Sequence, residues 1–111
     1  MNCEFQRRDG ILHVSGELNI YSAAAFRDAL LATLAGDPES CLIDCAGVTE
    51  IDTAGLQFLL MAKRACNARN MRCEVLAPSA ALGETLDLLD LRADLVAPDT
   101  AGSPAAQEIS R

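Results

Sequence analysis

The chain has 111 residues, half of them apolar, and its 16 acidic and 9 basic residues give a net charge of −7. One domain with an aliphatic core fits this length, since Trp is absent and aromatic residues make up only 4%. The acidic balance argues against non-specific binding to nucleic acid or to an anionic membrane surface, because both need basic patches. We therefore expect protein partners and no nucleic acid.

The N-terminal sequence MNCEFQRRDG lacks the apolar segment of a signal peptide, and no apolar run approaches the roughly 18 residues of a membrane span. We expect a cytoplasmic protein without direct membrane insertion. Its five cysteines form no C-x-x-C pair, and in a reducing compartment we expect free, mostly buried thiols. They are Cys3, Cys41, Cys45, Cys66 and Cys73.

A β-hairpin is predicted at the start of the chain. Residues 3–8 alternate in polarity, which is typical of a half-buried strand. The pair Asp9-Gly10 favours a tight turn, because both residues tolerate positive φ. Residues 11–18, with the sequence ILHVSGEL, are the expected returning strand.

A helix from about residue 23 to residue 35 follows, with Ser22 as its expected N-cap. Apolar residues at helical spacing predict its buried stripe. This stripe consists of Phe26, Leu30, Leu31 and Leu34. The sequence CLIDC at residues 41–45 then predicts a strand inside the sheet, because it lacks the alternation of an outer strand.

A loop over residues 46–52 is expected to connect this strand to a second helix from about residue 53 to residue 69, with Asn70 as a left-handed cap. Residues 71–78 predict the next strand. Ser79 is the expected cap of a third helix, whose stripe would contain Leu82, Leu86 and Leu89.

The predicted order of elements is β-β-α-β-α-β-α, which indicates the α/β class. We expect a mixed central sheet of about four strands with three or more helices packed mainly against it. Residues 1–97 form the single predicted domain. Residues 98–111 have little to bury and predict a flexible C-terminal tail.

No metal site is predicted. Cys41 and Cys45 could share one face of a strand, but their Cα atoms would lie about 13 Å apart at the rise of a strand. This is too far for joint ligation of one ion. His13 is the only histidine, so it offers a single nitrogen ligand.

Enzyme motifs are also missing from the sequence. It contains neither a G-x-S-x-G nucleophile motif nor a phosphate-binding P-loop, so we predict no catalytic residue and no cofactor. Asp44, at the end of a predicted buried strand, is the most interesting acid, with Glu50 and Asp52 in the loop beyond it. A small enzyme that uses Asp44, Asp52 or His13 stays an alternative hypothesis.

The sequence EIDTAGLQFLL, residues 50–60, has two interpretations. Asp52 or Thr53 can cap the second helix, which is the commoner role for such residues. A hydroxyl at a helix N-terminus is also well placed for phosphorylation, because the backbone N–H groups and the positive end of the helix dipole stabilise a phosphate. The new charge of about −1.5 to −2 would repel an acidic or apolar partner surface. From spacing alone, both interpretations stay open.

Three segments resemble the STAS domain family, which is named for sulfate transporters and anti-sigma factor antagonists. GELNIYSAAAFRDAL is similar to the family's segment between its second strand and first helix. CLIDCAGVTEIDTAGLQFLL is similar to its central strand, loop and phosphoacceptor helix, and MRCEVLAPSAALGETLDLLDL to its last strand and helix. The resemblance covers roughly residues 3–95 and implies a STAS-like fold.

For function, the resemblance implies a phosphorylation-controlled protein-binding switch of the anti-sigma factor antagonist type. Thr53 matches the phosphoacceptor, and the unphosphorylated protein would bind an anti-sigma factor that is also a serine/threonine kinase. A phosphatase would reset the switch. The positions that match the partner-binding surface are Asn19, Tyr21, Ser22, Asp52, Ala54, Gly55 and Leu56.

Two residues depart from the pattern of well-known antagonists. Their acceptor is Ser where this chain has Thr53, and a frequent acid after the GEL sequence is Asn19 here. Threonine at the acceptor position also occurs in the STAS subunit of the Mla lipid-asymmetry ABC transporter, which binds an ATPase subunit. The alternative expectation is therefore a non-catalytic adaptor of such an ATPase or of a chemotaxis-linked signalling complex.

Overall fold

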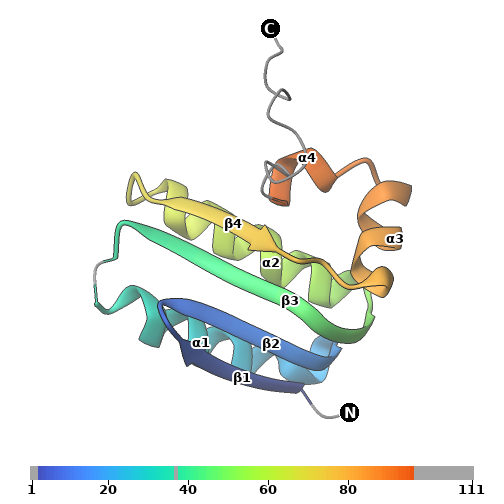
Figure 1. Cartoon of the computed structure of the whole chain (residues 1–111), viewed down its shortest axis with the longest axis horizontal. Coiled ribbons are helices and arrows are strands. Elements are labelled where there is room, and N and C mark those ends of the chain that lie inside the picture. The colour runs from blue at the N-terminus through green and yellow to red at the C-terminus, as the bar shows by residue number, and fades with distance from the viewer. Residues whose placement is uncertain (1–2, 37, 97–111) are drawn as a thin grey trace, which may run out of the picture.

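The computed structural model describes residues 3–36 and 38–96 and contains one four-stranded sheet (Figure 1). The strands are β1 (Cys3–Arg8), β2 (Ile11–Leu18), β3 (Ser40–Ile51) and β4 (Arg72–Leu76), in the spatial order β1-β2-β3-β4. β1 runs antiparallel to β2, whereas β2, β3 and β4 are mutually parallel. The predicted mixed α/β sheet is thus confirmed. The expected tail, residues 98–111, lies outside the described residues.

Five helical segments accompany the sheet within the described ranges. They are η1, a 3-10 helix (Ile20–Ser22), and the α-helices α1 (Ala23–Leu34), α2 (Thr53–Asn67), α3 (Ala80–Leu88) and α4 (Arg92–Leu95). Figure 1 shows α1 and α2 side by side behind the sheet, while α3 and α4 lie toward its β4 side. The sequence predicted neither η1 nor α4.

The tight turn between β1 and β2 is confirmed by its backbone. Asp9 has φ 54° and Gly10 has φ 78°, the left-handed conformation that this residue pair tolerates. Asn70 has φ 57° and ends the connection from α2 in the predicted way. Local residue chemistry is sufficient to predict both turns.

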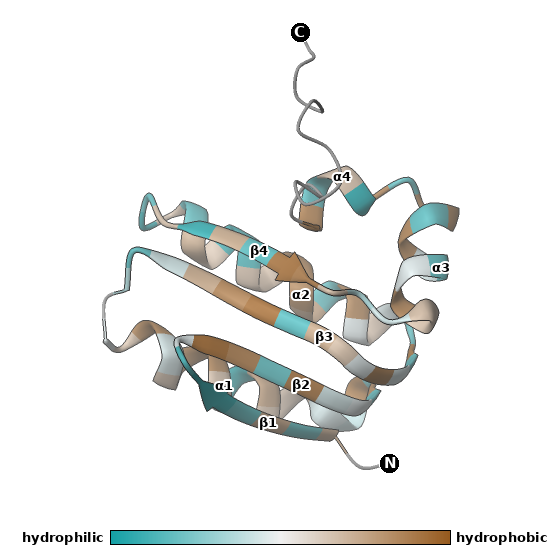
Figure 2. Ribbon diagram, in the orientation of Figure 1, coloured by the Kyte–Doolittle hydropathy of each residue, from teal (hydrophilic) through white to brown (hydrophobic). Residues whose placement is uncertain are grey.

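The core lies between the sheet and its helices, with Leu82 and Leu86 of α3 and Leu95 of α4 among its buried residues. The buried side chains of β2 and of the first half of β3 alternate with half-buried ones, so one face of each strand points toward the helices. Figure 2 shows long apolar stretches along β2 and β3, whereas β1 at the edge of the sheet is largely hydrophilic. Phe26 of α1 packs edge-on against Phe5 of β1 and stacks on Phe58 of α2.

β3 differs most from the prediction. It extends to Ile51, so residues 46–51 are strand where a loop was expected. They pair with the second half of β2, through partners that include Gly47 with Ser15 and Ile51 with Leu18. The exposed residues of this half look like a loop in the sequence, but buried Val48 and the pairing with β2 hold it in extended form.

Smaller differences concern the ends and faces of the helices. Leu31 and Leu89 were expected in buried stripes, yet both are more than half exposed. Leu31 follows Leu30 directly and therefore points away from the face that Leu30 buries. Leu89 lies one residue beyond the end of α3. α2 ends at Asn67 and β4 at Leu76, each two residues earlier than expected.

Candidate functional site

The candidate site forms where the parallel strands β2 and β3 end. Leu18 and Ile51 are paired at this edge, and the backbone N–H of Asp52 donates to the carbonyl of Leu18 at 3.3 Å. The chain leaves β2 into η1 and leaves β3 into α2, and these two segments contact each other. This arrangement places residues 19–22 beside the first turn of α2, as expected from the carboxyl edges of parallel strands.

Asp52 is the N-cap of α2, and Thr53 is the first helical residue. The Asp52 carboxylate accepts from the backbone N–H of Gly55 at 2.8 Å, and the Asp52 carbonyl accepts from Leu56. Thr53 is exposed, and its hydroxyl has no hydrogen-bond partner among the described residues. Asp52 therefore caps the helix, and the Thr53 hydroxyl takes no part in capping.

The threonine hydroxyls elsewhere in the described chain distinguish Thr53 further. Thr33 and Thr85 are half-buried, and each donates to the backbone carbonyl four residues earlier in its helix. Within the same ranges, only Thr49 and Thr53 are exposed. Thr49 lies near the end of β3, so among the threonines of the described ranges only Thr53 is both exposed and at a helix N-terminus.

Gly55 allows α2 to sit directly against the end of β2. A Cβ atom at this position would collide with the Leu18 carbonyl oxygen and lie 2.9 Å from its carbonyl carbon. Both obstacles are backbone atoms, which cannot rotate away. The glycine is therefore what sets the distance between Thr53 and the segment that follows β2.

Asn19 and Ser22 build η1 through a reciprocal set of hydrogen bonds. The Asn19 side chain accepts from the N–H of Tyr21 at 2.9 Å, and the Ser22 hydroxyl accepts from the N–H of Asn19 at 3.3 Å. The same hydroxyl donates to the carbonyl of Glu17 at 3.0 Å. Ser22 occupies the N-cap position of α1, as expected, but its side chain makes no capping hydrogen bond there.

This small network turns two apolar side chains out into solvent. Ile20 is 61% exposed and Tyr21 is 87% exposed, beside the start of α2. Tyr21 was a predicted partner-binding position, whereas Ile20 was missed. The exposure of Ile20 could have been predicted from its position between Asn19 and Ser22, because a short capped turn exposes its middle residues.

The surroundings of Thr53 carry negative charge. Glu50 and Asp52 are exposed, and Glu17 pairs with Glu50 across β2 and β3. Residues 17–22 and 49–57 contain no Lys or Arg. We call the surface formed by Ile20, Tyr21, Glu50, Asp52 and Thr53 the Thr53 surface. Its combination of an exposed aromatic ring, an exposed hydroxyl and acidic groups suits recognition by another protein.

Three of the predicted partner-binding residues lie beneath this surface. Ser22, Gly55 and Leu56 are buried, so in this conformation these residues support the surface from below and are not open to a partner. Ala54 and Asn19 are half-buried. Phe58 of α2 stacks on Phe26 with 5.8 Å between ring centroids and so packs against the core.

Asp44 and His13 do not join the site. Because β3 continues to Ile51, Asp44 lies in the first half of this strand and not at its carboxyl end, as was expected. It is paired with His13 of β2, and their Oδ2 and Nδ1 atoms are 3.7 Å apart. Both side chains are half-buried, and Asp44 also accepts from the N–H of Ala46. The alternative site that groups Asp44 with Asp52 therefore has no support in the geometry.

Comparison with protein families identifies the family to which this chain belongs. A family model described as "Mlab, STAS domain" matches residues 1–97. The chain belongs to the STAS domain family. No curated protein matches this STAS domain. Within the described residues, none of its helices is both long and apolar enough to cross a membrane.

Solved structures show the same fold at low sequence identity. An anti-sigma factor antagonist from Mycobacterium paratuberculosis matches with a TM-score of 0.72 and 23% identity, over 96% of this chain and 93% of that one. The anti-sigma factor antagonist SpoIIAA, in its unphosphorylated form, matches with a TM-score of 0.67 and 14% identity, over 99% and 100%. RsbS from Moorella thermoacetica matches with a TM-score of 0.58 and 18% identity, over 96% and 98%.

Proposed function

We propose that this STAS domain is a phosphorylation-controlled protein-binding switch of the anti-sigma factor antagonist type. In the unphosphorylated state, the Thr53 surface binds a cytoplasmic partner that is both an anti-sigma factor and a serine/threonine kinase. Transfer of phosphate to Thr53 releases the partner, and a phosphatase restores binding. The protein itself is non-catalytic and needs no cofactor for this role.

The observation that carries the proposal is the exposed Thr53 hydroxyl at the first position of α2, which has no hydrogen-bond partner within residues 3–36 and 38–96. Asp52 takes the N–H groups of Gly55 and Leu56, so those of Thr53 and Ala54 remain for an added phosphate. The positive end of the helix dipole favours the same charge. The start of α2 is thus suited to hold Thr53 both with and without a phosphate.

The charge around Thr53 explains how phosphate would end binding. The unphosphorylated surface exposes Ile20 and Tyr21 next to two acids, so we expect a partner whose apolar groups face Ile20, Tyr21 and Thr53. A phosphate adds about −1.5 to −2 at the centre of this surface. Its hydration opposes burial against the apolar part of a partner, and an unpaired buried charge costs several kcal/mol.

The test uses the kinases encoded near this protein's gene. The full chain is incubated with each kinase and ATP, and the modified residue is mapped by mass spectrometry. We expect phosphate on Thr53, none in Thr53→Ala, and unchanged phosphorylation in Thr49→Ala, which removes the other exposed threonine. In calorimetry, Thr53→Glu is expected to weaken partner binding at least tenfold. Modification of other residues with Thr53 untouched would overturn the proposal.

An adaptor role is the second candidate, and the description of the matching family model favours it. In this case the Thr53 surface would bind an ATPase subunit of an Mla-type ABC transporter, or a chemotaxis-linked complex, in a permanent way. Co-purification with the candidate ATPase distinguishes the two roles. An adaptor complex would survive treatment with kinase and ATP, whereas a switch complex would dissociate. Tyr21→Ala should weaken the complex in both cases.

A further inference from the structure

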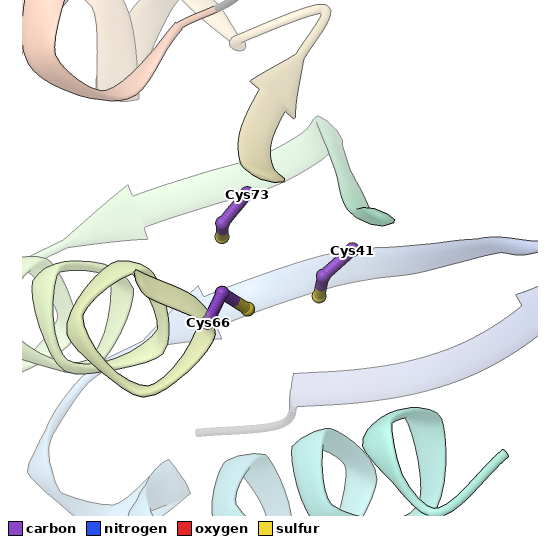
Figure 3. Close-up of side chains that lie close together, drawn as sticks. All are labelled: Cys41, Cys66 and Cys73. Carbon is purple, nitrogen blue, oxygen red and sulfur yellow. The ribbon is translucent and has the colours of Figure 1, made fainter. Parts of the chain in front are cut away.

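Three cysteines from distant parts of the sequence meet in the core. Cys41 is the second residue of β3, Cys73 the second of β4 and Cys66 the next-to-last of α2. Their three Sγ atoms lie within 4.8 Å of one another, and all three residues are buried (Figure 3). We call this group the cysteine cluster. It lies at the opposite end of α2 from Thr53 and is separate from the proposed switch.

The backbone around the cluster fixes the three side chains. Cys41 and Cys73 are direct partners in the parallel pairing of β3 with β4, so their side chains share one face of the sheet. α2 packs on that face, and the N–H of Met71 donates to the carbonyl of Cys66 at 2.8 Å. This bond closes the turn between α2 and β4 and holds the end of the helix over the start of both strands. The cluster is therefore preorganised by three elements.

A buried cysteine normally packs as a small apolar side chain. Here three sulfur atoms face one another, which is the arrangement of a thiolate metal site. In a planar site with bonds of about 2.3 Å, the sulfur atoms are about 4.0 Å apart. The upper limit of 4.8 Å in the structure thus lies less than 1 Å from a ligating geometry. Metal binding therefore requires the sulfur atoms to move closer by less than 1 Å.

We propose that Cys41, Cys66 and Cys73 form a binding site for one Cu(I) ion. A set of three sulfur donors selects a soft metal over the hard cations that prefer oxygen. Among the described residues, no His, Asp or Glu belongs to the group, and burial excludes a water ligand. Zn(II) in structural sites takes four ligands, so a closed three-sulfur site suits Cu(I) better.

The proton and charge balance of binding is simple. Each sulfur that binds the metal gives up its thiol proton to the solvent, and copper enters and stays as Cu(I), so no electron is transferred. Burial raises the pKa of the Cys66 thiol and so opposes its thiolate, whereas the charge of Arg69 acts in the opposite direction. The Arg69 guanidinium also donates to the carbonyl of Leu34 at 3.4 Å. Binding is therefore expected to release protons.

The chain supplies a matched control. Cys45 lies four residues after Cys41 in β3 and is equally buried, but it does not belong to the cluster. Cys45→Ala therefore removes a core thiol from the same strand without touching the proposed site. Cys3, half-buried at the start of β1, gives a second control in Cys3→Ala.

The experiment titrates the reduced full-length protein with Cu(I) under anaerobic conditions, in competition with the Cu(I) chelator bathocuproine disulfonate. We expect one Cu(I) per chain and an affinity at least tenfold lower in Cys66→Ala and Cys73→Ala, with no change in Cys45→Ala and Cys3→Ala. Failure of the chain to compete for Cu(I), or equal losses in Cys45→Ala and Cys66→Ala, would overturn the proposal.

X-ray absorption of the copper-loaded wild type tests the site without relying on variants that fold poorly. We expect only sulfur neighbours at about 2.3 Å, the length of a metal–thiolate bond. Nitrogen or oxygen atoms bound to the copper would mean that the ion lies outside the cysteine cluster, and would overturn the assignment. A parallel titration with Zn(II) is expected to show weaker binding than Cu(I). Tighter binding of Zn(II) would contradict the three-coordinate site.

Discussion

Gly55 has no room for a side chain, and this makes it the most sensitive position of the candidate site. An added methyl group would meet the carbonyl oxygen and carbon of Leu18. We predict that Gly55→Ala lowers the free energy of unfolding by about 3 kcal/mol, because the helix must move away from the end of β2. Urea denaturation followed by circular dichroism measures this change.

Gly83 is the control for this substitution, because it is also a buried helical glycine. A Cβ atom there would lie 2.8 Å from Nη2 of Arg92, the far end of a flexible side chain. The gain in helix propensity from Gly to Ala, about 1 kcal/mol, offsets the displacement of this group. Gly83→Ala should therefore change stability by less than about 1 kcal/mol. Equal losses in the two variants would contradict the contact with Leu18.

The buried thiol of Cys45 is expected to make the stability of the protein depend on pH in alkaline solution. Burial, helped by the charge of Asp44, raises the pKa of Cys45 from its ordinary value near 9 to about 12. Between these two values the unfolded chain loses the thiol proton while the folded chain keeps it. The stabilisation is thus complete below pH 9 and is lost as the pH rises toward 12, by about 1.4 kcal/mol per pH unit.

The measurement is urea denaturation of the wild type and Cys45→Ala at pH 8, 9, 10 and 10.5. We expect the difference in unfolding free energy between the two proteins to be constant from pH 8 to 9. Above pH 9 the wild type should lose its advantage steadily. An unchanged difference at pH 10.5 would mean that the thiol is not protected in the folded protein.

At the scale of elements, α2 depends on its N-cap. The carboxylate of Asp52 accepts from the N–H of Gly55, and removal of such a cap costs about 1 kcal/mol. We predict this loss for Asp52→Ala in thermal or urea unfolding. Asp52→Asn keeps an acceptor oxygen and should recover most of the stability. If the Asn variant were as unstable as the Ala variant, the charge and not the hydrogen bond would carry the effect.

The elements that the sequence predicts well are those that local chemistry determines. The turn at Asp9-Gly10, the helix start at Asp52 and Thr53 and the cap at Ser79 all follow from residues within three positions of one another. The second half of β3 does not, because its exposed residues are held extended by pairing with β2. That pairing joins segments that are far apart in the sequence, so no short stretch of sequence reveals it.

The candidate site also has some features that follow from local sequence and others that depend on contacts between distant segments. Thr53 could be singled out from its own helix start, but the exposure of Ile20 depends on the hydrogen bonds between Asn19 and Ser22. The burial of Ser22 and Leu56 depends on how η1 and α2 meet. The cysteine cluster was missed because the sequence suggested only a test of pairs within one strand. Its members come from β3, α2 and β4, so only the packed structure brings them together.

For the whole molecule, the Thr53 surface and the cysteine cluster are at opposite ends of one helix. Thr53 is the first residue of α2, and Cys66 lies 13 positions later, which corresponds to about 20 Å along the axis. Between them the buried residues of α2 include Leu59 and Ala62, and the helix packs on β3 and β4. The two sites are thus separated by more than the roughly 10 Å within which substitutions usually couple.

We therefore predict that substitutions at the two ends act independently on stability. The effects of Thr53→Glu and Cys66→Ala on the free energy of unfolding should add to within about 0.5 kcal/mol in the double variant, as is usual for sites more than about 10 Å apart without common partners. Urea denaturation of the wild type, both single variants and the double variant completes this cycle. A coupling above about 1 kcal/mol would instead mean that α2 responds as one unit, so that a change at the cysteine cluster reaches the helix start and alters the surface that presents Thr53.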